Sequence, residues 1–382
     1  MMYVFDCEVF AYDWLFIFKN IATGEYTIIH NDNHAIKQFM TADKLLVGFN
    51  NKHYDNYILK GVLCGADNIL LKEINDFIID GNLGFEHWFL RENQAWFNSF
   101  DIRDDMQRGL NLKAIEGHLG LDIEESSVSF DIDRPLTKKE LEETIQYCKY
   151  DVDVTERLVK IRKAYLETKL ELGRMAGIPD NKALYSTNAK IVAMFLNAQP
   201  KEWNDERKYK CPKNLKEELI PIEIFRFFNR MYDSEIDDKE LFSSKLEFNI
   251  QNNPCVIGFG GIHSGLPNYL EKSEGKRVIR NFDVGSYYPS LMIQCGYISR
   301  NIPLAAIFEK VYHDRMKAKQ EGDKRTSDTL KLVLNTTYGA MLNKYNALYD
   351  PLMGRSVCIS GQLFLTDLVM AYVKTCKTIR II

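Results

Sequence analysis

The chain has 382 residues, enough for two or three domains, and its apolar content of 46% is typical of a globular protein. No apolar run approaches the roughly 18 residues of a membrane span, and an acid stands at position 6, so we expect neither a membrane partner nor a signal peptide. The net charge of −4 is divided unevenly, because residues 1–165 carry −10 and residues 166–382 carry +6.

The pattern of apolar residues in the acidic N-terminal part of the chain predicts a sheet flanked by helices. We expect four strands, over residues 3–10, 14–19, 26–29 and 45–49. A helix should begin near Asn56. A second, long helix should begin at Thr137, where Glu140 completes a capping box, and run to about Leu172. The acidic charge of this part suits a metal-dependent nuclease, although a solvated acidic domain would look the same.

The second part has a weaker pattern. Residues 173–255 show glycine breaks and polar stretches, so we interpret them as a connecting region. Beyond them we expect a strand over 278–284, a helix from Pro289, a helical hairpin over 304–342 that turns at Gly322-Asp323, a helix over 361–376 and a terminal strand over 378–382. The basic charge suits a surface that holds a nucleic-acid template.

Asp6 and Glu8 lie two residues apart in the first predicted strand, so both should project from one face of it. Phe5, Cys7 and Val9 should face the other way and be buried. Paired carboxylates can bridge two divalent cations that act on a phosphodiester. A lone Asp-x-Glu is nevertheless common by chance in an acidic chain.

Two further segments strengthen this prediction. The strand that ends near Phe49 leads into Asn51-x-x-Tyr54-Asp55, and the long helix carries Tyr147-x-x-x-Asp151 on one face. Each could be structural alone, Asp55 as a helix cap and Tyr147 as a surface residue. In this order the three segments resemble the exonuclease motifs of the 3′→5′ proofreading domain of family B DNA polymerases, which has an RNase H-like fold.

The resemblance implies a role for each matching residue. Two Mg²⁺ or Mn²⁺ ions per active site would be held by Asp6, Glu8, Asp55 and Asp151. Tyr147 would orient the attacking water, while Asn51 and Tyr54 would grip the 3′ end of single-stranded DNA. Protein-primed relatives also use a lysine between the second and third motifs. Residues 124–130 contain none, so this role stays unassigned.

Two segments of the second part resemble the polymerase motifs A and B of the same family. The first is Asp283-Val-Gly-Ser286-Tyr287-Tyr288-Pro-Ser, with Tyr287 where the family has leucine. The resemblance implies that Asp283 is a catalytic metal ligand and that Tyr288 packs under the sugar. The turn from Ser286 through Tyr287 offers free amides to a triphosphate.

The second segment is Lys331-x-x-x-Asn335-x-x-Tyr338-Gly339, in the predicted helical hairpin. Arg315 and Lys319 lie four apart on the other helix, and residues 310–346 carry a net charge of +4. A solvated basic hairpin would explain the charge alone. The resemblance implies that these cations and Asn335 bind nucleotide phosphates, with Tyr338 and Gly339 near the nascent base pair.

The expected fold class is therefore α/β and α+β multidomain. The domains would be an RNase H-like exonuclease (1–172), a connecting region (173–257), the first part of a palm (258–303), fingers (304–345) and a second, incomplete part of the palm (346–382). The family's acidic third motif normally follows a strand such as 378–382. None follows here, so we expect another polypeptide to supply this motif and the thumb.

The expected substrates are primer-template and single-stranded DNA and deoxynucleoside triphosphates, in viral or phage DNA replication. Two alternatives stay open: a stand-alone 3′→5′ exonuclease, and a non-catalytic DNA-binding remnant. The eight cysteines contain no Cys-x-x-Cys pair, which favours reduced thiols in a cytoplasm over disulfides or a zinc site. A phage origin would make this the cytoplasm of a bacterial host.

Overall fold

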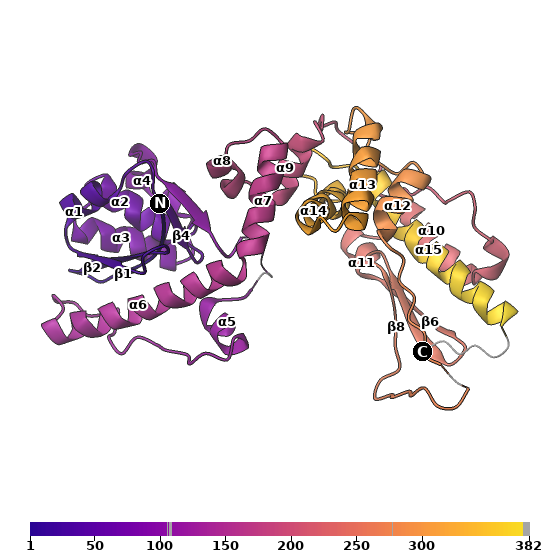
Figure 1. Ribbon diagram of the computed structural model, residues 1–382, viewed down its shortest axis with the longest axis horizontal. Helices are drawn as coiled ribbons and strands as arrows, with labels where there is room; N and C mark the ends of the chain where they lie inside the picture. Colours follow the sequence, from indigo (N-terminus) through magenta and orange to yellow (C-terminus); the bar gives the residue numbers. More distant parts are fainter. Residues whose placement is uncertain (105, 107–108, 277, 377–382) are drawn as a thin grey trace. The chain divides into compact units, whose positions relative to one another are not determined.

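The computed structural model describes residues 1–104, 106, 109–276 and 278–376, and the chain divides into two compact units (Figure 1). Unit 1 contains Met1–Arg174 and Ile178–Thr187. Unit 2 contains Met175–Gly177 and the described residues from Asn188 onward. Both units combine strands with helices, so the expectation of a mixed α/β chain of several domains is confirmed at this level.

Unit 1 is built on a five-stranded mixed sheet of order β3-β2-β1-β4-β5. The antiparallel pairs are β1–β2 and β2–β3, and the parallel pairs are β1–β4 and β4–β5. The strands are β1 (Met2–Val9), β2 (Trp14–Asn20), β3 (Tyr26–His30), β4 (Leu45–Gly48) and β5 (Asn98–Asp101). The helices are α1 (Asn33–Phe39), α2 (Asp55–Leu63), α3 (Asn68–Ile79), η1 (Gly84–Glu86), α4 (Trp88–Glu92), α5 (Leu112–His118), α6 (Lys138–Ile161), α7 (Lys163–Met175) and α8 (Asp180–Tyr185).

Side-chain alternation along β1 gives the sheet two buried faces. Phe5, Cys7 and Val9 pack in one apolar cluster with residues of α1, α2 and α3. Val4 packs in a second cluster that includes Cys148 of α6. Because successive side chains of a strand point to opposite faces, Asp6 and Glu8 share the face of Val4, toward α6.

The predicted first strands and the start of the long helix are confirmed. Thr137 caps α6, and Glu140 bonds back to it in the expected capping box. The helix does not continue to Leu172, however. It ends at Ile161 and α7 begins at Lys163. Neither glycine nor proline marks this break, so no residue near it signals the end of the helix.

Unit 2 contains a small antiparallel sheet of order β6-β7-β8 and several helices. The strands are β6 (Lys245–Ile250), β7 (Asn253–Gly258) and β8 (Ile262–Ser264). The helices are α9 (Asn188–Phe195), η2 (Glu217–Leu219), α10 (Ile222–Asn229), η3 (Arg230–Tyr232), α11 (Asp238–Ser243), α12 (Tyr287–Gln294), α13 (Ala305–Gln320), α14 (Lys324–Met341) and α15 (Pro351–Thr375). The hairpin of α13 and α14 is confirmed, with Gly322 at a positive φ of 75° in its turn.

Helix α15 is the one described helix that is long and apolar enough to cross a membrane, by length and composition. This agrees with the absence of a continuous apolar run of that length, because polar residues such as Ser356, Gln362 and Asp367 interrupt the helix. Half of its most apolar window is buried, and Ile359 and Leu363 belong to the core of unit 2. Packing within the unit therefore accounts for much of its apolar character.

Two predictions for the second part are corrected, and the connecting region is described in more detail. Residues 278–284 form no strand, because no described strand pairs with them, and Val278, Ile279 and Phe282 are exposed. The helix expected from residue 361 begins at Pro351 instead, behind an Asp350 cap. The connecting region has regular structure of its own and contributes to the unit 2 core. The predicted terminal strand lies outside the described residues.

Candidate active sites

A group of carboxyl side chains from β1, α2 and α6 forms the first candidate site, here called the carboxylate site: Asp6, Glu8, Asp55 and Asp151. Glu8, Asp55 and Asp151 are buried, and Asp6 is partly buried. These are the four residues that the sequence motifs predict as metal ligands. Segments nearly 150 residues apart supply them, so the fold of unit 1 brings the three motifs together.

The turn after β4 positions Asp55 at the first residue of α2. Asn50 has a positive φ of 61° there, and its backbone N–H donates to the buried Asp101 carboxylate at 2.9 Å. A Cβ on Gly48 would come within 2.7 Å of the Cβ of Asn51, so the close turn requires glycine. The Cys7 thiol donates to Asp55 Oδ1 at 3.2 Å.

Helix α6 carries Tyr147 and Asp151 one turn apart, and burial and the nearby Asp151 charge raise the pKa of the Tyr147 hydroxyl. Lys113 of α5 donates to Asp151 Oδ1 at 3.0 Å, and its ammonium lies 5.0 Å from the centre of the Tyr147 ring. Sequence reasoning missed Lys113, because it searched for a lysine only in residues 124–130. Asn111 caps the short helix that carries Lys113, but no local pattern shows that Lys113 contacts Asp151 of α6.

The carboxylate site has an excess of negative charge, because four carboxyl groups face the single ammonium of Lys113. Burial raises the pKa of Asp6 and Glu8, and the surrounding carboxylates raise it further. Burial also raises the pKa of Asp55 to about 6, against the hydrogen bonds that it accepts. For Asp151, burial raises the pKa while the Lys113 ammonium opposes the shift. Several hard oxygen donors with excess negative charge are the donor set that Mg²⁺ or Mn²⁺ prefers, so these residues fit the implied ions.

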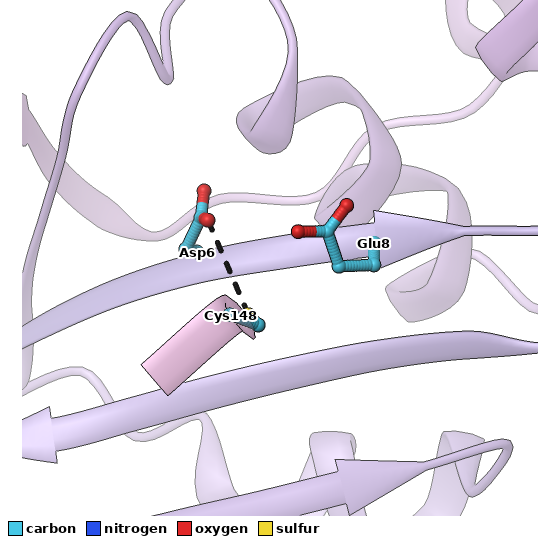
Figure 2. Close-up of side chains that lie close together, drawn as sticks. All are labelled: Asp6, Glu8 and Cys148. Carbon is cyan, nitrogen blue, oxygen red and sulfur yellow. Dashed lines mark hydrogen bonds between the residues drawn. The ribbon is translucent and has the colours of Figure 1, made fainter. Parts of the chain in front are cut away.

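Cys148 also lies in this site, as Figure 2 shows. Its Sγ is 4.0 Å from Asp6 Oδ2, and the ligand atoms of Asp6, Glu8 and Cys148 all lie within 4.8 Å of one another. The sequence assigned Cys148 only to the apolar stripe of its helix. This assignment is also correct, because Cys148 belongs to the core cluster between α6 and the face of the sheet that carries Val4.

The two residues expected to bind the 3′ end of DNA, Asn51 and Tyr54, differ in their exposure to solvent. Asn51 is fully buried, and its amide donates to Ser99 Oγ at 2.6 Å and to Asn56 Oδ1 at 3.1 Å. In this structure Asn51 supports the turn, and its contact with DNA stays a prediction. Tyr54 is partly exposed, with its hydroxyl donating to Asn75 Oδ1 at 2.5 Å.

The second candidate site is a pocket of about 350 Å³ within unit 2, here called the basic pocket. Its lining residues are Ser286, Tyr287, Tyr288, Pro289, Arg315, Lys331 and Asn335. All but Pro289 are predicted substrate-binding residues. The start of α12, the middle of α13 and the middle of α14 therefore meet around one cavity, with two cationic side chains in its wall.

The start of α12 has a backbone suited to an anion. Ser286 precedes the helix with a positive φ of 55°, which is uncommon for serine. The Arg315 guanidinium donates to Ser286 Oγ, while its buried Nε has no partner among the described residues. An unsatisfied buried guanidinium donor beside a helix N-terminus favours a bound phosphate or carboxylate.

The tyrosines of the basic pocket are held by α15. Tyr287 donates to the Gly361 carbonyl at 2.7 Å, and the rings of Tyr288 and Tyr338 lie 4.6 Å apart. A Cβ on Gly361 would come within 3.1 Å of the Tyr288 ring, so glycine permits this close approach. Burial raises the pKa of Tyr288 to about 12, which keeps its hydroxyl neutral.

Three predicted residues of unit 2 stand apart from this pocket. Asp283 is exposed, and Lys319 and Gly339 are exposed residues that do not line the cavity. In the described part of the chain, the one group of three or more metal-ligating side chains is in unit 1. Asp283 therefore has no described partner carboxylates with which to hold two metal ions.

Comparison with known proteins yields little at the level of sequence. No protein-family model matches the chain. No curated protein matches it either. Among solved structures it is similar to the family B DNA polymerase from the hyperthermophilic archaeon Pyrobaculum calidifontis, with 13% sequence identity and a TM-score of 0.49. The match covers 98% of this chain and 51% of the archaeal one, so the chain spans about half the length of that polymerase.

Proposed function

We propose that the chain is a DNA-processing enzyme of the family B polymerase kind, with a 3′→5′ exonuclease of RNase H-like fold in unit 1. The observation that carries this proposal is the convergence of Asp6, Glu8, Asp55 and Asp151 beside Tyr147. The sequence resemblance adds the substrate, single-stranded DNA. Mg²⁺ or Mn²⁺ would supply charge neutralisation at the scissile phosphate and a more acidic water.

The residues of unit 1 would each perform a distinct part of the reaction. The carboxylates would hold the ions, with Asp6 and Glu8 spaced by strand β1 and with Asp55 and Asp151 positioned by helices α2 and α6. Tyr147 is neutral, because burial and the Asp151 charge raise its pKa, so its hydroxyl can orient a water molecule. Lys113 donates a hydrogen bond to Asp151 and would offset the negative charge that develops on the leaving oxygen of the DNA.

Unit 2 would bind a deoxynucleoside triphosphate in the basic pocket, with the palm and fingers roles that motifs A and B imply. The support is the shared cavity of Arg315, Lys331 and Asn335 at the start of α12. The unpaired Arg315 Nε and the backbone around Ser286 suit phosphate oxygens. Viral or phage replication in a bacterial cytoplasm is part of this proposal on the sequence resemblance alone.

The exonuclease is tested by digestion of a 5′-labelled single-stranded oligonucleotide with Mg²⁺. Asp6→Ala combined with Glu8→Ala should lower the rate by at least about a thousandfold, because both ions lose ligands. The folded state should not lose stability, since a crowded set of like charges is relieved. Digestion by the double variant at the wild-type rate would refute the assignment.

The chain offers a matched control for this experiment. Asp131 and Asp133 form another Asp-x-Asp pair, but both side chains are exposed and lie in a loop. Replacing both by alanine changes the charge by the same amount and should leave digestion unchanged. A shortening ladder from the 3′ end, and none from the 5′ end, would establish the polarity.

A stand-alone exonuclease is the second candidate function. The observation that favours it is the contrast between the carboxylate site and the exposed Asp283, which has no described partner ligands. Under this reading unit 2 binds DNA or nucleotide without adding to a primer. Primer extension distinguishes the two functions, as described in the Discussion.

A further inference from the structure

The carboxylate site contains a donor that Mg²⁺ chemistry does not use. Cys148 is fully buried, and its Sγ lies 4.0 Å from Asp6 Oδ2. Glu8 is 9% exposed, and its carboxylate takes part in no hydrogen bond recorded for the described residues. In Figure 2 the Glu8 carboxylate extends toward Asp6. The site thus places a carboxylate that has no recorded hydrogen bond close to a buried thiol.

The distances between the three ligand atoms are short enough for one small cation to contact all of them. The three ligand atoms lie within 4.8 Å of one another. In a tetrahedral zinc site with bonds of about 2.0–2.3 Å, donor atoms are roughly 3.5 Å apart. Small side-chain rotations of Glu8 and Asp6 would close that difference. A water molecule would complete the coordination, as in open zinc sites.

We propose that Asp6, Glu8 and Cys148 form a binding site for a thiophilic divalent cation of the Zn²⁺ class, which competes with Mg²⁺ and inhibits the nuclease. Thiolate ligands select Zn²⁺ and its heavier relatives, whereas Mg²⁺ prefers oxygen alone. On binding, the Cys148 S–H bond breaks, its proton passes to solvent, and the sulfur bonds to the metal. The inhibitory part of this inference rests on the proposed nuclease.

The alternative is that Cys148 is only a small apolar residue of the core. That role explains its contacts with the second face of the sheet but not the direction of its Sγ toward Asp6. Cysteine spacing in the sequence could not reveal such a site, because its ligands come from β1 and α6, 140 residues apart. A cation would also neutralise the charge that Asp6 and Glu8 concentrate there.

The test is a Cd²⁺ titration of the full chain, followed by the ultraviolet absorption of the thiolate-to-metal charge-transfer transition. Surface thiols also respond, so the informative quantity is the difference between wild type and Cys148→Ser. We expect the variant to lose the signal of one thiolate per chain. The matched control is Cys255→Ser, because Cys255 is equally buried but lies in unit 2, and its signal should equal that of wild type.

Zn²⁺ affinity, measured by competition with a chromophoric chelator, should fall at least about tenfold in Cys148→Ser. Replacing a residue that only hydrogen-bonds to a metal ligand already lowers metal affinity by about 10–100-fold. Cys148→Ala should behave alike if the serine variant unfolds. Equal Cd²⁺ spectra and equal Zn²⁺ affinity in wild type and both variants would overturn the inference.

Nuclease assays separate this inference from the proposed function. In Mg²⁺, added Zn²⁺ should inhibit wild type at lower concentrations than Cys148→Ser, each normalised to its own activity without Zn²⁺. A thiolate signal without any Mg²⁺-dependent digestion would support the metal site and contradict the nuclease. Digestion with the same Zn²⁺ sensitivity in both proteins would contradict the metal site and support the nuclease.

Discussion

The carboxylate site of unit 1 and the basic pocket of unit 2 are built for opposite partners. The first gathers four acidic side chains and one lysine in a buried position between a sheet and a helix. The second has Arg315 and Lys331 around an open cavity, with its one predicted acid, Asp283, exposed outside it. One site can attract cations, and the other can attract a polyanion.

This difference separates two requirements of phosphoryl transfer. Catalysis by two metal ions needs carboxylates that hold both ions, while substrate binding needs cations that hold phosphates. The described residues of unit 1 meet the first requirement, and those of unit 2 meet the second. Activity should therefore be easier to detect in unit 1, and binding in unit 2. The predictions below test that division.

The largest expected effect is a missing activity. Primer extension by the chain with Asp6→Ala and Glu8→Ala, in which digestion cannot mask synthesis, should be negligible although primed template and nucleotide bind. Asp283 alone cannot hold two ions. Adding a polypeptide that carries an acidic hairpin of the third-motif type should restore synthesis. Robust extension by the chain alone would show that unit 2 contains a complete active site.

Lys113→Ala should reduce the rate of Mg²⁺-dependent digestion by about 10–100-fold, because Asp151 loses the cation that orients it. Lys113→Arg should restore part of the rate, since it keeps the charge. The measurement is the single-turnover rate across a range of Mg²⁺ concentrations. Lys149, on the α6 surface near Tyr26, provides a control whose replacement by alanine should have no effect. A rate for Lys113→Ala equal to wild type would remove this residue from the mechanism.

Arg315→Ala should weaken the binding of a deoxynucleoside triphosphate by roughly 1–3 kcal/mol, the range for charge-assisted hydrogen bonds. Arg315→Lys should retain only part of the affinity, because it loses the planar fork. Lys319→Ala is the matched control on the same helix. Since Lys319 is exposed and does not line the cavity, its loss should cost less than about 0.5 kcal/mol. Equal losses for both variants would mean that only net charge matters.

The smallest expected effect is a pH dependence of stability without metal. The folded state raises the pKa of Asp55 from 3.8 to about 6, so it binds protons more tightly than the unfolded chain does. Stability should therefore be greatest below pH 4 with respect to this group and should fall as the pH rises through about 6. In EDTA the Tm of the first transition should be a few degrees lower at pH 8 than at pH 5, because 1 kcal/mol corresponds to about 2–4 °C.

Mg²⁺ should recover that loss at pH 8, since it binds the ionised carboxylates of the folded state. The Asp131→Ala and Asp133→Ala variant should show the same pH and Mg²⁺ response as wild type. A Tm that rises from pH 5 to pH 8 in EDTA would contradict the raised pKa values.

Much of the local structure was predictable because it depends on neighbours in sequence. The alternation of Phe5, Cys7 and Val9 with Asp6 and Glu8 predicted both faces of β1. Thr137 and Glu140 predicted the start of α6, and Gly322 the turn of the helical hairpin. The strand expected over 278–284 failed because a strand needs a partner, which an apolar pattern cannot guarantee.

The sequence by itself determined the spacing of residue types within each strand and helix. Spacings of two, four and seven residues identified the four candidate carboxylates and the basic faces of the helical hairpin. Only the tertiary structure decided which distant side chains meet. Packing brought Lys113 to Asp151 and Cys148 to Asp6, buried Asn51, and selected Arg315 over Lys319 for the pocket wall. The physical reason is that periodicity follows from backbone geometry, whereas contacts across 30 or more residues depend on how the apolar faces of whole elements are buried together.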